Sequence, residues 1–141
     1  MDYKIRAAAS KNYIVLKIYS DITLEHAREF TRELAAMVES SKIQNIFVDA
    51  RGVRNVISTF DNYTYAYKEM AELGLRQNIR SACLIDPHDK SHNFVETVIQ
   101  NAGYVTRMFT NENESIDWLF QDESNSASNK AELINLLKTE F

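Results

Sequence analysis

The chain has 141 residues and a formal net charge of -4, from 16 Lys and Arg against 20 Asp and Glu, which suits one acidic domain and argues against nucleic acid as a partner. Its single cysteine, Cys83, excludes an internal disulfide and a cysteine metal cage. No run approaches the roughly 18 apolar residues of a membrane span, and residues 1–6 lack the apolar run of a signal peptide, so we expect a cytoplasmic protein that does not span a membrane.

The first third of the chain predicts a β-hairpin followed by a helix. Residues 3–9 and 13–19 are expected strands, because apolar residues alternate in the second and a short polar turn joins the two. A connection this short favours an antiparallel pair. Apolar residues then recur at three- and four-residue spacing, which predicts an amphipathic helix that Thr23 caps and that ends near Ser40.

Strands and helices are expected to alternate along the rest of the chain. The predicted elements are a strand at 43–50, a helix at 59–75, a strand at 81–86, a helix at 94–102, a strand at 104–110 and a helix at 111–121. The order is therefore β-β-α-β-α-β-α-β-α. Alternation after the hairpin implies parallel strands joined by right-handed crossovers, so we expect an α/β fold with a mixed, mostly parallel sheet.

The end of the chain differs in composition. Residues 1–121 form the predicted domain, and residues 122–129 read as a polar linker because they contain no apolar residue larger than Ala. Residues 130–141 form a predicted amphipathic tail that carries Leu133, Ile134, Leu136, Leu137 and Phe141. Such a tail must be covered by its own domain or by a second chain, so we also predict a homodimer.

Polar residues follow the three predicted parallel strands. They are Asp49, Arg51, Asp86, His88 and Asn111. Because ligands bind outside the carboxyl ends of parallel strands, these residues are the candidate rim of a ligand or partner site. We call this group the strand-end rim.

The second predicted helix begins beside this rim. Ser58 or Thr59 starts it, and Asp61 follows in a capping-box pattern, so helix capping is the ordinary interpretation of Ser58 and Asp61. A helix amino end also suits an anion or a phosphate. Ser58 and Thr59 are therefore candidate switch residues, and Asp61 is a candidate rim residue.

The same helix is rich in aromatic side chains. Phe60, Tyr63 and Tyr67 follow one helical stripe, so we expect them to pack in the core. Tyr65 falls on the opposite side and is predicted to be exposed or to meet a partner, so it is a further candidate rim residue.

Catalytic patterns are weak in this sequence. His88 and His92 are four residues apart beside acidic residues, which leaves a metal-dependent hydrolase as a minor alternative, although Pro87 would break a helix before them. Cys83 lies in an apolar strand, where a thiol is normally inert. Phosphate-binding glycine loops and nucleophile elbows are lacking. We therefore predict no catalytic residue, no metal and no cofactor.

Three stretches carry a family resemblance. They are residues 47–53 (Phe-Val-Asp-Ala-Arg-Gly-Val), 57–61 (Ile-Ser-Thr-Phe-Asp) and 111–119 (Asn-Glu-Asn-Glu-Ser-Ile-Asp-Trp-Leu). Together they resemble the SpoIIAA-like family, bacterial proteins related to STAS domains, which have the fold of anti-sigma-factor antagonists. The resemblance covers residues 3–121 and implies a four- or five-stranded mixed sheet with helices mainly on one face.

The resemblance also has functional implications. In the antagonists a Ser or Thr at the start of the second helix is phosphorylated by an anti-sigma kinase, and this position corresponds to Ser58 or Thr59. The antagonist pattern there is Asp-Ser-Ser-Gly, whereas this chain reads Ile57-Ser58-Thr59-Phe60. Some relatives are also compared with Sec14-like lipid carriers.

Two functions follow as expectations. The first is a non-catalytic, STAS-like regulatory module that binds a protein partner, which remains unidentified, under phosphorylation control at the second helix. The second is a carrier of a small apolar or anionic ligand at the strand-end crevice.

Overall fold

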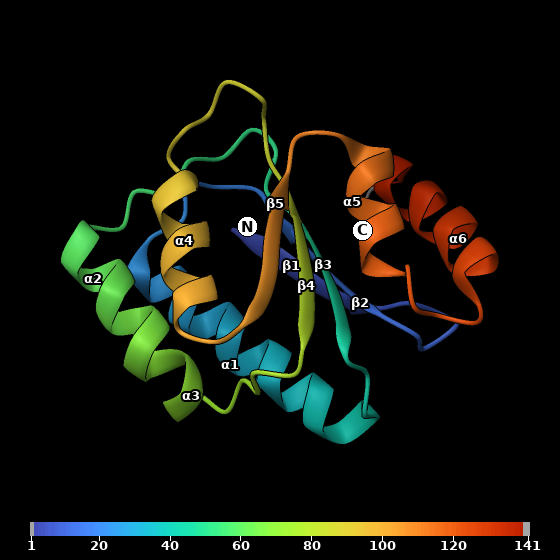
Figure 1. Cartoon of the computed structure of the whole chain (residues 1–141), viewed down its shortest axis with the longest axis horizontal. Coiled ribbons are helices and arrows are strands. Elements are labelled where there is room, and N and C mark those ends of the chain that lie inside the picture. Colours follow the sequence, from blue (N-terminus) through green and yellow to red (C-terminus); the bar gives the residue numbers. More distant parts are fainter. Residues whose placement is uncertain (1, 140–141) are drawn as a thin grey trace.

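A computed structural model describes residues 2–139, and its centre is one five-stranded sheet (Figure 1). The strands are β1 (Tyr3–Ala7), β2 (Ile14–Ile18), β3 (Asn45–Asp49), β4 (Arg80–Leu84) and β5 (Val105–Phe109), and they lie in that order. β1 pairs antiparallel with β2, and every later pair is parallel. The predicted antiparallel hairpin and the mostly parallel five-stranded sheet are confirmed.

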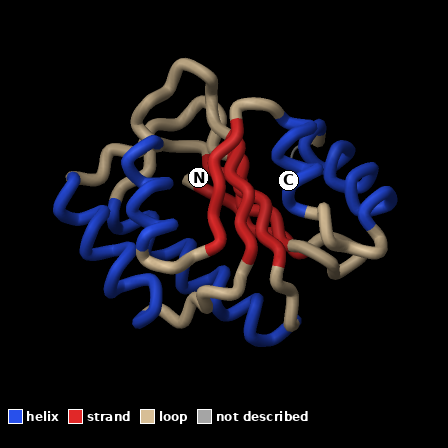
Figure 2. Tube along the Cα trace, in the orientation of Figure 1, coloured by secondary structure: helices blue, strands red, loops and turns tan. Residues whose placement is uncertain are grey.

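Helices cover both faces of this sheet (Figure 2). One face carries α1 (Leu24–Ser41), α2 (Thr59–Thr64), the π-helix η1 (Tyr65–Glu69), α3 (Met70–Glu72) and α4 (Asn93–Asn101), and the other carries α5 (Glu112–Leu119) and α6 (Ser126–Lys138). Most of the helical residues thus lie on one face of the sheet, as the resemblance implies. No helix in the described part of the chain is long and apolar enough to cross a membrane.

The alternating side chains of the strands divide the interior into two cores. The α1–α4 core joins Leu16 and Ile46 of the sheet to Leu34 of α1 and Val95 of α4. The α5–α6 core joins the opposite side of the same strands to the two last helices, and its members include Tyr13, Phe47, Phe120, Leu119 and Leu133. Successive residues of a strand point to opposite faces, so each strand supplies both cores.

The segment from Thr59 to Glu72 is helical, as predicted, but its orientation differs from the expectation. Tyr65 is buried, whereas Phe60, Tyr63 and Tyr67 are exposed. The predictions for these four side chains were therefore wrong. The segment has a second apolar stripe, Tyr65, Ala66 and Met70, which faces the core. The buried Tyr65 hydroxyl has a hydrogen-bond partner in Thr31 of α1, so its burial leaves no polar group unpaired.

A π-helical turn lies in the middle of this segment. The Met70 N–H donates to the Tyr65 carbonyl oxygen, five residues back. A π-turn holds one residue more than an α-turn, so it shifts the phase of the side chains that follow. A prediction from the sequence that assumes a constant period of 3.6 residues per turn does not include this shift.

The predicted linker and tail also need correction. Residues 122–129 are not a linker throughout, because α6 begins at Ser126. Its Leu133 and Leu137 are one helical turn apart and buried in the α5–α6 core, which gives the helix a reason to form. The tail therefore packs on its own domain, and the observation that motivated the homodimer prediction is lost. Met1 of the predicted domain and Phe141 of the predicted tail lie outside the described residues.

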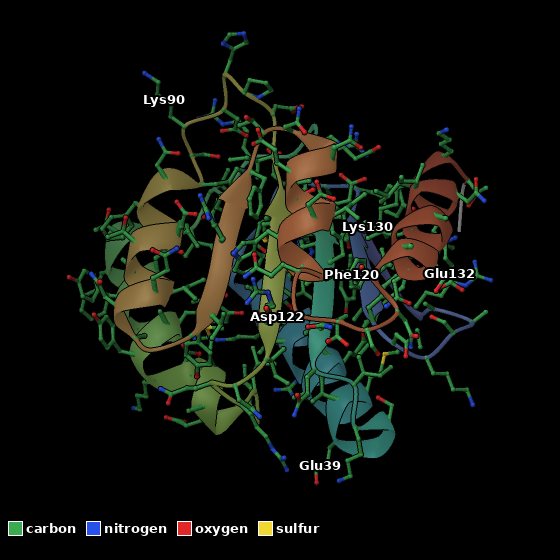
Figure 3. The ribbon with its side chains drawn as sticks, turned by 45° about the vertical axis from the view of Figure 1, so that its right-hand side comes forward. Glu39, Lys90, Phe120, Asp122, Lys130 and Glu132 are labelled. Carbon is green, nitrogen blue, oxygen red and sulfur yellow. The ribbon has the colours of Figure 1, made fainter. Side chains whose placement is uncertain are left out.

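Polar contacts fasten α6 to its neighbours. The Ser10 hydroxyl donates to Glu132 over 2.7 Å, and the Lys130 ammonium lies 2.9 Å from the Asp117 carboxylate. Figure 3 shows Lys130 and Glu132 along this helix and Phe120 just beyond the end of α5.

The outer strand β5 is bound along its edge by side chains of α4. Glu96 accepts the Met108 N–H over 2.6 Å, and the Gln100 amide donates to the Thr106 carbonyl oxygen over 2.8 Å. Glu96 and Gln100 are four residues apart, so they lie on one face of α4. Gly103 then ends this helical segment with φ of 99°, as expected for a left-handed cap.

Candidate functional site

At the strand-end rim, Arg51 joins Asp49 and the neighbouring Glu112 in a network of charged side chains. Arg51 donates two hydrogen bonds to Asp49, over 3.0 and 2.9 Å, and its guanidinium also lies 3.5 Å from Glu112. Asp86 accepts the Gly52 N–H over 2.6 Å. The loops after β3 and β4 and the start of α5 therefore meet at one edge (Figure 1), as the parallel sheet predicts.

The charge of Arg51 is already balanced within this network. The two hydrogen bonds to Asp49 are the largest cause that raises the pKa of Arg51, and Glu112 and Asp86 add to it. A guanidinium with three carboxylates around it attracts a further anion poorly. These contacts hold the loops after β3 and β4 and the start of α5 together, and they leave no unbalanced positive charge on Arg51 to bind a small anionic ligand.

The candidate switch residue Ser58 and the rim residue Asn111 act as helix caps. The Ser58 hydroxyl accepts the Asp61 N–H over 3.2 Å at the start of α2, and the Asn111 side chain accepts the Glu114 N–H over 2.9 Å at the start of α5. Both contacts satisfy backbone donors that a helix start leaves open. Ser58 and Thr59 are exposed and thus reachable from solvent.

The two histidines of the metal alternative have different surroundings. His88 is exposed in a loop, whereas His92 is buried, with its Nε2 3.1 Å from the Val53 carbonyl oxygen and 3.4 Å from Asp89. Among residues 2–139, no group of three or more His, Cys, Asp or Glu side chains is placed to hold a metal ion.

Tyr65, the remaining predicted rim residue, lies away from the rim. It is buried between α1 and the sheet, where burial raises the pKa of its phenol well above the usual range. Together with Thr31 it lines a cavity of about 110 Å³ between the sheet and the α1–α4 layer. Cys83 lines the same cavity, and burial raises the pKa of its thiol to about 12, so the thiol stays protonated and inert.

Sequence reasoning missed an exposed aromatic surface on α2 and the π-helix η1 that continues it. Phe60 is 77% exposed, Tyr63 49% and Tyr67 52%, and Phe94 of α4 adjoins them. The Tyr63 and Tyr67 rings stack with centroids 5.4 Å apart, and the Tyr63 and Phe94 centroids are 5.9 Å apart. We call these four residues the α2 aromatic face. Their spacing is visible in the sequence, but it indicates a helical stripe without revealing which side is covered.

Comparisons with known proteins support the fold. No protein-family model and no curated protein matches the sequence. The structure is similar to that of an uncharacterised DUF3478-family protein from Shewanella loihica PV-4, described as having a SpoIIAA-like fold. The two chains are 15% identical with a TM-score of 0.51, over 83% of this chain and 91% of the other. This likeness confirms, at the level of architecture, that the chain has a SpoIIAA-like fold.

Proposed function

We propose that this chain is a non-catalytic protein-interaction module whose partner docks on the α2 aromatic face. The observation that carries the proposal is the exposure of four neighbouring aromatic rings on one surface. Single exposed apolar residues are normal, whereas clusters of them mark interaction surfaces. Tyr and Phe are also enriched in protein interfaces.

The shape of the surface supports a protein partner. Thr59, Phe60, Tyr63, Thr64 and Tyr67 line a shallow groove along α2. A groove of this kind is too open to enclose a small molecule but suits side chains that protrude from another protein. The partner we propose presents aliphatic or aromatic side chains to this groove.

A non-catalytic role is supported by the state of the strand-end rim. Within residues 2–139, Asp49, Arg51 and Glu112 pair with one another and Asp86 holds a backbone N–H, so these groups are committed to contacts within the fold. A general base or nucleophile needs a partner arranged for proton transfer instead.

Phosphorylation at Ser58 is the proposed control. Ser58 is exposed and directly precedes the α2 aromatic face, and a phosphate would add nearly two negative charges there. The carboxylate of Asp61, in the first turn of α2, would repel this phosphate and strain the cap. Phosphorylation would then change both the charge of the docking surface and the conformation of the first turn of α2. Thr59 is the neighbouring alternative.

A photo-crosslinking experiment tests the docking surface. A photoreactive phenylalanine at position 67 should capture one partner from cells of the source organism, whereas the same residue at Val105, which is exposed on the α5 side of the sheet, should not. The double variant Tyr63→Ser/Tyr67→Ser should abolish binding of that partner while the circular dichroism spectrum stays unchanged. Equal capture from both positions, or binding that survives the double variant, contradicts the proposal.

The switch is tested separately. Incubation with cell lysate and ATP should add a phosphate at Ser58 or Thr59, which intact-mass and peptide analysis would detect. Ser58→Asp should weaken binding of the partner more than Ser58→Thr does. If neither residue is modified, the switch is wrong, while the docking surface stands on its own experiment.

A further inference from the structure

The cavity between the sheet and the α1–α4 layer is uncharged. Strands β2 to β5 form its floor, and side chains of α1, α2 and α4 cover it. Its lining contains no Asp, Glu, Lys or Arg side chain. Moving an unpaired charge into such a space costs far more than any contact there returns, so any occupant must be neutral.

One lining residue, Asn62, has a buried side-chain oxygen without a partner. Asn62 is 6% exposed and lines the cavity, and its Nδ2 donates to the Ile57 carbonyl oxygen over 3.2 Å. Because a carbonyl can only accept, this contact fixes which side of the amide is nitrogen. Within residues 2–139 no donor reaches the Asn62 Oδ1, which is buried. A buried acceptor without a donor is unfavourable and rare in native proteins.

Four other polar residues of the lining have hydrogen-bond partners. Thr31 and Tyr65 hydrogen-bond to each other through their hydroxyls, and the His92 Nε2 lies on the Val53 carbonyl oxygen. Asn55 accepts the Ile57 N–H over 3.0 Å. The contact between the two hydroxyls uses only one of their two hydrogens, so it leaves one O–H to donate. The lining thus needs a donor for Asn62 and can offer one in return, and a hydroxyl group meets both requirements.

We propose that this cavity binds a small neutral molecule with an apolar, ring-sized body and one hydroxyl group that donates to the Asn62 Oδ1. The size agrees with this class, because an engineered apolar cavity of roughly 150 Å³ holds benzene, and the cavity here measures about 110 Å³. The π-helical turn that follows Asn62 belongs to a type of distortion that concentrates at functional sites. This interior site is distinct from the α2 aromatic face, and its tests are independent of that proposal.

A comparison of two probes tests the hydroxyl requirement without any variant. Phenol and benzene have nearly the same shape, and only phenol carries a donor. Titration of a methyl-labelled sample, followed by NMR, should shift methyl signals of lining residues such as Val95 and Ile99 with both probes. Phenol should bind about tenfold more tightly, which is the effect of one buried hydrogen bond that is otherwise left unmade.

Three variants locate the effect. Asn62→Leu should make the two probes bind equally, whereas the matched control Tyr13→Phe, which removes a buried hydroxyl from the α5–α6 core, should leave the tenfold preference intact. Val95→Phe should fill the cavity and weaken both probes.

Several outcomes would overturn the proposal. Binding of neither probe would mean that a single water is enough for Asn62, and equal binding of both by the wild-type protein would remove the hydroxyl requirement. A preference that persists in Asn62→Leu would place the hydroxyl elsewhere. If Asn62→Leu does not fold, the two probes on the wild-type protein decide the question.

Discussion

On the α5–α6 side of the sheet, Tyr13, Phe47 and Phe120 are completely buried, whereas the core on the α1–α4 side contains a cavity of about 110 Å³. The two sides also differ in their outer surfaces, because the exposed rings of the α2 aromatic face belong to the cavity side. Closely packed interiors resist any change of volume, and loosely packed ones accept it. We infer from this difference that the α5–α6 side mainly stabilises the fold, while the α1–α4 side carries the features that we connect with binding.

The largest expected effect comes from breaking the well-packed side. Phe120→Ala should lower the free energy of unfolding by about 3–5 kcal/mol, because it removes a fully buried ring that packs edge-on against Tyr13. Urea unfolding followed by circular dichroism measures the loss. Phe94→Ala, which truncates a ring on the other side that is partly exposed, is the matched control and should cost about 1 kcal/mol or less. Equal losses would contradict the contrast between the two sides.

Neighbouring residues of β4 provide a sharper comparison, because Ala82 faces the α5–α6 core and Cys83 faces the cavity. Ala82→Val and Cys83→Ile each add two heavy atoms. We expect Ala82→Val to destabilise the protein by about 1–3 kcal/mol through overpacking. Cys83→Ile should be neutral or should stabilise it by up to about 1 kcal/mol, since it fills empty space. Denaturant midpoints of the two variants, measured side by side, check the sign of each change.

The smallest expected effect is a dependence on alkaline pH. Burial raises the pKa of Cys83 from 9.0 to about 12, so above pH 9 the unfolded chain loses this proton while the folded protein keeps it. The stability from this group is complete below pH 9 and is lost as pH rises toward 12, by about 1 kcal/mol per pH unit. Urea unfolding at pH 8, 9 and 10 should therefore show a shallower decline for Cys83→Ile than for the wild-type protein. Ala82→Val, which removes no titrating group, should keep the wild-type slope.

Much of the architecture could be predicted from the sequence because it depends on local periodicity. Alternation in β2 indicates a strand, and the three- and four-residue spacing in α1 records which face of that helix is buried. The order of elements then predicts a mostly parallel sheet. The meeting of Arg51 with Glu112 at the strand-end rim also follows from that topology.

The candidate sites could not be predicted in the same way. The segment at Thr59–Glu72 has two apolar stripes, and which one is buried depends on how the segment packs against α1 and the sheet. Helix α6, which begins at Ser126, is stabilised by the burial of its Leu133 in the α5–α6 core, and this contact is not visible in the local sequence. The cavity and the unpaired oxygen of Asn62 arise from packing between distant segments, which no local pattern records.

The side chains of α4 along β5 have a consequence for assembly. Glu96 and Gln100 occupy a backbone N–H and a carbonyl group that another extended chain would need in order to join the sheet at this border. Growth of the sheet by an added strand is therefore hindered here, which protects the protein from edge-to-edge aggregation. Association through this border would first have to displace two side chains, so complexes are expected to form through helical surfaces instead.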